Sequence, residues 1–184
     1  YIKDLKELWD KALEYFPSNY KLGEVLSDKV ILMYDNKKEL GITDKQIYDE
    51  ADKAYKQDLV NFTNPKALYI YFSAIVDLYD AKQVPIQNVF DKYDDVSEKI
   101  ESEIRNYAEM LNKLVEKEEP GQQLTSKESQ YKAQYESYLE AYDKISGSVD
   151  GKLGILANCE NLIPLYKKDF QGFDVLTYHG VSYP

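Results

Sequence analysis

The sequence is short of the residues that most often carry catalysis. Its 184 residues include one cysteine, one histidine and one tryptophan. A single cysteine, Cys159, excludes an internal disulfide, so cysteine pairing does not indicate the compartment. Cys159 and His179 invite a nucleophile–base pairing, but no strand–turn–helix elbow surrounds Cys159. We interpret Cys159 as a helix-packing residue and His179 as an exposed tail residue, and we expect no enzyme activity and no cofactor.

Positive charge is also scarce. Arg105 is the only arginine, and 23 basic residues face 33 acidic ones, which gives a formal charge of -10. Arginine is the usual residue for bidentate recognition of carboxylates and phosphates. The lysines are dispersed next to Asp or Glu, and a negative field repels phosphate backbones. We therefore expect that nucleic acid is not a partner.

Long apolar runs are absent as well. The longest nearly apolar stretch, ALYIYFSAIV at 67–76, is far shorter than the roughly 18 to 20 residues that a membrane helix needs. We expect no transmembrane segment. An apolar share of 43% with 30% charged residues is typical of a globular protein with a continuous core. The sequence begins at Tyr1, so we expect that an N-terminal segment has been cleaved or left out.

Two local patterns are similar to ligand sites but lack the required spacing. GSVDGKL at 147–153 has three residues between its glycines where a phosphate-binding loop needs four, and Leu153 follows Lys152 where Ser or Thr is needed. The acidic clusters at 94–95 and 116–119 lack the alternating oxygen ligands of a calcium loop. We interpret them as solvated helix faces, and we expect neither nucleotide nor metal binding.

What the sequence has in quantity is helical periodicity. Apolar residues recur at steps of three and four between breakers, and strict alternation is scarce. Thr43 and Thr125 begin capping patterns, and Asn64 followed by Pro65 is an N-cap with proline at the first helical position. We predict an all-α protein with antiparallel neighbours. Its seven helices are expected over 5–16, 20–34, 43–62, 64–80, 85–118, 125–145 and 155–170.

Two segments are predicted to be irregular, and one helix is unusually long. The glycine-rich stretch 146–154 is expected to be a loop, and 171–184 a non-helical tail after a helical domain over 1–170. The helix at 85–118 would span roughly 50 Å. Its apolar stripe could dimerise as a coiled coil or pack on flanking helices of the same chain, and Ser97 on the stripe favours the second. The stripe comprises Ile86, Phe90, Tyr93, Ile100, Ile104, Tyr107, Leu111 and Leu114.

A regular spacing near the N-terminus recurs in part further along the chain. It is formed by Leu5, Trp9, Ala12 and Pro17, and then by Ala51, Tyr55 and Leu59. On paired helices, the aromatic fills the gap, the alanine permits close approach and the proline ends the second helix. The chain resembles the tetratricopeptide repeat family over 5–17 and partly over 51–65.

This resemblance implies antiparallel helix pairs stacked as an irregular right-handed solenoid that binds other proteins or peptides. The irregularity is expected because the helices after residue 65 exceed the family's roughly 34-residue period. CENLIPLYKKDF at 159–170 also resembles the opening helix of a late repeat in secreted repeat proteins of the Bacteroidota. That implies a periplasmic, outer-membrane-associated or secreted protein, with the cytoplasm as the alternative. The phase of the spacing further predicts that the chain is a piece of a longer array.

One segment, YKAQYESYLEAYD at 131–143, concentrates tyrosine. Helical steps of four, three and four place its tyrosines on one stripe opposite a charged face: Tyr131, Tyr135, Tyr138 and Tyr142. We interpret the stripe as a packing seam, because the helix needs a core side. The alternative is a groove that stacks a glycan or other small ligand. The sequence thus favours a non-catalytic protein–protein interaction scaffold within a larger protein or envelope assembly, with a ligand-binding helical module as the alternative.

Overall fold

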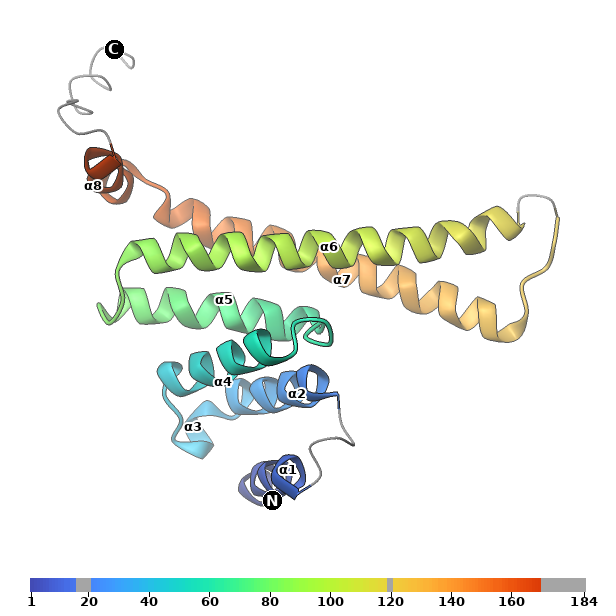
Figure 1. Cartoon of the computed structure of the whole chain (residues 1–184), viewed down its shortest axis with the longest axis horizontal. Helices are drawn as coiled ribbons and strands as arrows, with labels where there is room; N and C mark the ends of the chain where they lie inside the picture. The colour runs from blue at the N-terminus through green and yellow to red at the C-terminus, as the bar shows by residue number, and fades with distance from the viewer. Residues whose placement is uncertain (16–20, 119–120, 170–184) are drawn as a thin grey trace, which may run out of the picture.

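The computed structural model describes residues 1–15, 21–118 and 121–169, and helices make up 84% of these residues. No strand occurs among them, so the prediction of an all-α protein is confirmed. Pro17, His179 and the tail at 171–184 lie outside the described residues. The helices are α1 Ile2–Tyr15, α2 Leu22–Asp35, α3 Lys37–Leu40, α4 Asp44–Gln57, α5 Pro65–Asp80, α6 Ile86–Glu118, α7 Ser126–Leu156 and α8 Cys159–Asp169 (Figure 1).

Three helices begin at the residues predicted to cap them. The Thr43 side chain accepts a hydrogen bond from the backbone N–H of Gln46, whose side chain accepts one in return, and Thr125 forms the same box with Glu128. Asn64 accepts hydrogen bonds from two backbone N–H groups in the first turn of α5. These bonds satisfy donors that the first turn of a helix leaves unpaired. The three predicted caps are therefore confirmed.

Helix α5 is the centre of the molecule. It packs against α2, α4, α6 and α7, and most of its side chains are buried. A helix that is apolar around its whole circumference has to be enclosed by other helices, which is why the run at 67–76 lies here. The packing follows chain order, because α2 packs on α4 and α5, and α5 packs on α6 and α7. Helix α1 packs on α2 at the edge of this stack (Figure 1).

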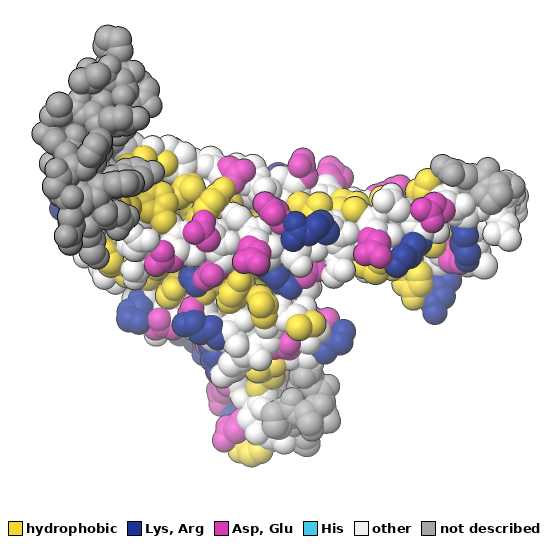
Figure 2. Space-filling model, turned by 45° about the horizontal axis from the view of Figure 1, so that its top comes forward, with side chains coloured by type: hydrophobic (Ala, Val, Ile, Leu, Met, Phe, Trp, Pro, Cys, Tyr) yellow, Lys and Arg dark blue, Asp and Glu magenta, His cyan; other side chains and the backbone are white. Residues whose placement is uncertain are grey.

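Helices α6 and α7 form a long antiparallel hairpin whose far half extends beyond α5 (Figure 1). We call residues 107–118 and 121–138 the arm, and we call α2, α4 and α5 with the remainder of α6 and α7 the body. No described residue of the arm is buried, whereas the body holds an extensive buried core. Apolar side chains stay visible among the charged ones along the arm (Figure 2). Two helices alone have no third element to close their seam.

The structure corrects three of the predicted helix boundaries. The stretch 146–154 is not a loop, because α7 continues through it to Leu156. Val149 is fully buried there and Leu153 packs on the core, so tertiary packing outweighs the roughly 1 kcal/mol that each glycine costs in a helix. Helix α4 ends at Gln57 rather than 62, and the short helix α3 was not predicted. Helix α8 begins at Cys159 rather than 155.

Helix α6 has two covered faces where the sequence predicts one. Its predicted stripe faces α7: the Tyr93 hydroxyl donates to Asp150 at 2.9 Å, and Tyr107 stacks on Tyr138. Most of that stripe is only half-buried. Apart from Ile100 of the stripe, the buried positions lie on a second face, which includes charged residues: Val89, Lys92, Val96, Lys99 and Glu103. This second face was not predicted, because helix periodicity alone does not show how many neighbours a helix has.

Candidate functional site

The residues of the repeat spacing lie on α1 and α4. Leu5 and Trp9 are half-buried on α1, and Ala51 is fully buried on α4. Ala12 belongs to α1, but its side chain, like Pro17, lies outside the described residues. The structure therefore places the two parts of the spacing on separate helices of the stack. Each part contributes packing atoms, and neither forms an open site.

Tyr55 belongs to an aromatic cluster that joins α4, α5 and α6. Its ring centre lies 5.3 Å from that of Tyr71, and its hydroxyl donates to the backbone carbonyl of Asp95 at 2.9 Å. Lys92 of α6 lies 4.6 Å above the Tyr71 ring centre and 2.7 Å from the Asp95 carboxylate. The Tyr71 hydroxyl donates to Asp52 at 2.6 Å. Burial opposes the charged form of Asp52, but hydrogen bonds from neighbouring side chains outweigh it and lower the pKa of Asp52.

Buried lysines are the feature that sequence reasoning missed. Lys29, Lys92 and Lys99 are exposed by only 4%, 8% and 8%. Lys29 pairs with Asp10 of α1 at 2.5 Å and lies 3.0 Å from Glu50 of α4, so it ties three helices together. Burial opposes the charged form of Lys29, but the two carboxylates outweigh it and raise its pKa. Lys92 and Lys99 each have a carboxylate three or four residues further on, but exposed pairs show the same signal. The positions three and four residues from Lys29 are all apolar: Val25, Leu26, Leu32 and Met33.

The four tyrosines of α7 lie along the seam between α6 and α7, around Tyr107 of α6. The Tyr107 ring centre lies 4.9 Å from that of Tyr138, 5.8 Å from Tyr135 and 5.9 Å from Tyr142. Tyr131 stacks on Tyr135 at 6.1 Å, with their ring planes 8° apart. The spacing along α7 thus brings all four rings into one continuous ladder.

Burial falls along this ladder from the body to the tip of the arm. Tyr142 is fully buried and donates to the backbone carbonyl of Thr63, Tyr138 and Tyr135 are half-buried, and Tyr131 is 40% exposed. A platform that stacks a sugar needs an open ring face. The faces of these rings are largely taken by each other and by α6, so the ladder is arranged for helix packing more than for ligand stacking.

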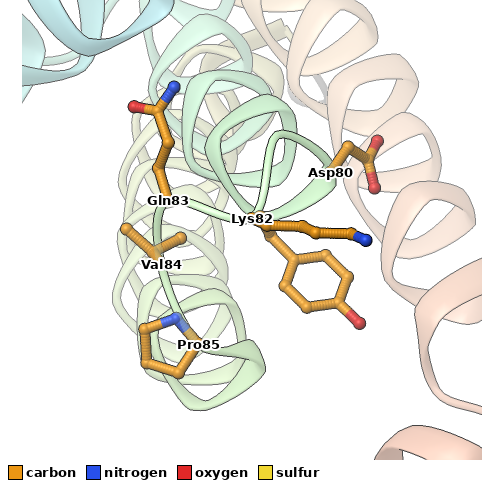
Figure 3. Close-up of a pocket in the computed structure, with 6 residues that line it drawn as sticks. Asp80, Lys82, Gln83, Val84 and Pro85 are labelled. Carbon is orange, nitrogen blue, oxygen red and sulfur yellow. The ribbon is translucent and has the colours of Figure 1, made fainter.

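A hollow of about 600 Å³ lies at the turn between α5 and α6. Asp80 and Lys82 point to one side of the turn, whereas Gln83 and Val84 point to the other (Figure 3). Catalytic groups have to converge on one reacting atom within hydrogen-bond distance. These side chains diverge, so the hollow is an open surface depression and not a reaction site.

The described part of the chain assembles neither a metal site nor a nucleophile with a neighbouring base. In residues 1–15, 21–118 and 121–169, no group of three or more His, Cys, Asp or Glu is placed to hold a metal ion. Cys159 is exposed at the first residue of α8, so the packing role predicted for it is wrong. Nor do these residues contain a helix with the length and apolarity to cross a membrane.

A polar face runs across α2, α5 and α7, and we call it the α2–α5–α7 face. Lys66 of α5 pairs with Asp35 of α2 at 2.7 Å, and Tyr69 of α5 lies 5.7 Å from the Lys152 ammonium of α7. Asp77 completes the solvent-reaching side of α5, where burial, together with a neighbouring aspartate, raises its pKa. The face thus presents rings and charges of both signs across three adjacent helices.

Comparison with known proteins leaves these surfaces to be interpreted from their own geometry. The aromatic cluster and the tyrosine ladder hold helices together, and the side chains named on the α2–α5–α7 face are exposed or half-buried. The chain matches no family model, and searches of curated proteins and of solved structures give no match.

Proposed function

We propose that the chain is a non-catalytic scaffold that binds other proteins through stacked tetratricopeptide-like helix pairs. The observation that supports this most is the packing order, in which α2 contacts both α4 and α5, and α5 contacts both α6 and α7. In a helical solenoid, a helix packs on its partner and on the first helix of the next repeat. The pairs would be α2 with α4 and α5 with α6, and α7 would begin the next pair of an irregular right-handed solenoid.

The phase of the repeat spacing agrees with this pairing. Tyr55 of α4 fills the gap between helices, as the aromatic of a second helix does, and the fully buried Ala51 permits close approach. Helices α1 and α4 are then second helices, which makes α2, α5 and α7 the first helices of their pairs. The long α6 and α7 depart from a regular repeat, and the arm is the part of them that extends past the stack.

The α2–α5–α7 face is the proposed contact surface, because exposed residues of the first helices face partners in such solenoids. Its mixture of Tyr69 with Lys66, Asp77 and Lys152 suits a polar protein surface or peptide. The resemblance of 159–170 to secreted repeat proteins supports a place in a larger envelope assembly, in the periplasm or at the outer membrane.

The test is capture of a protein partner by the full chain from an extract of its source, followed by a titration with the purified partner. Replacing Lys66 and Lys152 with serine should weaken binding, because both lie on the contact face. Lys113→Ser, at an exposed lysine of the arm, is the matched control and should leave binding unchanged. A chain that recovers no protein but binds soluble glycans on an array would contradict the scaffold function.

A further inference from the structure

A second surface lies between α6 and the connection that follows α4, and we call it the α4–α6 groove. A hollow of about 430 Å³ opens there, lined by Leu59 and Val60 on one side and by α6 from Glu98 to Asn106 on the other. From Glu98 to Asn106 the helix rises by roughly 12 Å. The groove is therefore sized for a short segment with one or two side chains inserted.

The connection contributes two apolar side chains that are held open to solvent. Leu59 is 44% exposed and Val60 is 79% exposed. Their position is fixed, because the next side chain but one, Phe62, is fully buried and the Asp58 carboxylate accepts a hydrogen bond from the Gly23 N–H at 2.8 Å. Apolar groups held beside a hollow gain free energy when a partner covers them. This edge of the groove thus offers a contact that the chain itself does not fill.

The wall formed by α6 continues an acidic stripe. Glu98 lines the groove, and Asp91, Asp94 and Asp95 precede it on α6 at steps of three and four residues; none of the four is buried. Lys92 pairs with Asp95 at 2.7 Å and offsets that carboxylate. Among the described residues no ion pair offsets Asp91, Asp94 or Glu98, so this stripe carries negative charge beside the groove.

The floor of the groove adds no net charge. Lys99 and Glu103 form an ion pair there, and each side chain is 8% exposed. Because Glu103 neutralises Lys99, the carboxylates of the wall set the sign of the field at the mouth. That field repels an acidic partner, and it repels a second copy of this chain, which carries the same formal charge of -10.

We propose that the α4–α6 groove docks a basic segment of a partner protein. An apolar side chain of the segment enters the hollow against Leu59 and Val60, and lysine or arginine side chains on either side of it lie over Asp94 and Glu98. This assignment rests on the proposed scaffold function and adds a second contact surface with a defined partner chemistry. Electrostatic complementarity selects the partner, and the apolar insertion holds it.

The experiment titrates the full chain into short fluorescent peptides and follows their anisotropy. One peptide is an amphipathic pattern of leucine and lysine, and its counterpart has glutamate in place of lysine. The leucine–lysine peptide should bind, and Val60→Ser should weaken it about tenfold by removing apolar contact. Glu98→Gln should weaken it about threefold. Ile155→Ser and Glu116→Gln, which make the same changes at exposed sites outside the groove, should leave the affinity unchanged.

Several results would overturn the assignment. Equal losses in groove and control variants would show that the peptide follows net charge alone. Tighter binding of the leucine–glutamate peptide would reverse the partner chemistry. A concentration-dependent mass in sedimentation that Val60→Ser abolishes would identify a second copy as the occupant.

If the groove variants bind the peptide as the wild type does while partner capture persists, the groove assignment fails and the scaffold function stands. If no variant and no wild-type chain captures protein, the scaffold function itself fails.

Discussion

The body and the arm share the same two helices, α6 and α7, and differ in what closes the seam between them. In the body, α5 lies against both helices, and Tyr142 is fully buried. In the arm no third helix is present among the described residues, and Tyr131 on the same stripe of α7 is 40% exposed. One residue type at one helical phase thus has two degrees of burial. The number of neighbouring helices decides the outcome, and the periodicity of α7 alone does not.

The largest contrast should come from removing one ring in each region. Phe62 is fully buried in the body and meets Tyr55 and Tyr71 edge to face at 6.1 and 6.3 Å. Phe62→Ala leaves a cavity, so the free energy of unfolding should fall by about 4 kcal/mol. Tyr135→Ala removes a half-buried ring against Tyr107 and should lower it by only about 1 kcal/mol. Urea titrations followed by circular dichroism measure both, and equal losses would show that the arm is packed as tightly as the body.

The next largest effect on the free energy of unfolding should come from Gly23, which lies against the backbone of the connection after α4. A Cβ added at Gly23 would meet backbone atoms of Asp58, Asn61 and Phe62 at 2.5 to 2.6 Å. Backbone yields less easily than a flexible side chain, so Gly23→Ala should lower the free energy of unfolding by about 3 kcal/mol. The same urea titration tests it. An unchanged free energy of unfolding would show that the connection after α4 shifts to make room for the methyl group. The body would then not be more rigid than the arm.

Helix starts could be predicted from the sequence because their causes are local. The caps at Thr43, Asn64 and Thr125 depend on donors within three residues of each side chain. The stretch 146–154 could not be predicted in the same way. Its helical state depends on burial of Val149, and α5, which packs on α7, is distant in sequence. The composition of this stretch shows its glycines. It does not show that α5 packs on α7 and that this packing outweighs the cost of the glycines in a helix.

The candidate surfaces show the same limit. The tyrosine stripe followed from spacing, but its gradient of burial depends on where α5 ends. Leu59 was counted as an apolar helix position, yet α4 ends at Gln57 and Leu59 is 44% exposed at the edge of the α4–α6 groove. Lys99 was not singled out from the sequence, and it lies on the floor of that groove. Both surfaces depend on helix ends and helix neighbours, which single-helix periodicity does not contain.

High pH should weaken the body through its phenols. Burial raises the pKa of both Tyr48 and Tyr55 from 10.0 to about 12. Between pH 10 and 12 the unfolded chain therefore binds fewer protons than the folded chain, so stability that is fully present below pH 10 is lost as pH rises through 12. Replacing both tyrosines with phenylalanine should flatten the slope of unfolding free energy against pH in that window. An unchanged slope would mean that other groups of the body titrate there.

The smallest effect should come from the glycines of α7, and it has the opposite sign. Gly147, Gly151 and Gly154 lie inside the helix, and a Cβ added at any of them meets nothing within 4 Å. Each change to alanine should therefore raise the free energy of unfolding by about 0.5–1 kcal/mol, mainly by restricting the unfolded chain. Urea titration of the triple variant measures the summed gain in the free energy of unfolding. Gly23→Ala, the glycine change that is expected to destabilise the chain, serves as the comparison. If the triple variant is stabilised but captures less partner, a partner approaches this side of α7, because no described residue of the chain lies against these three positions.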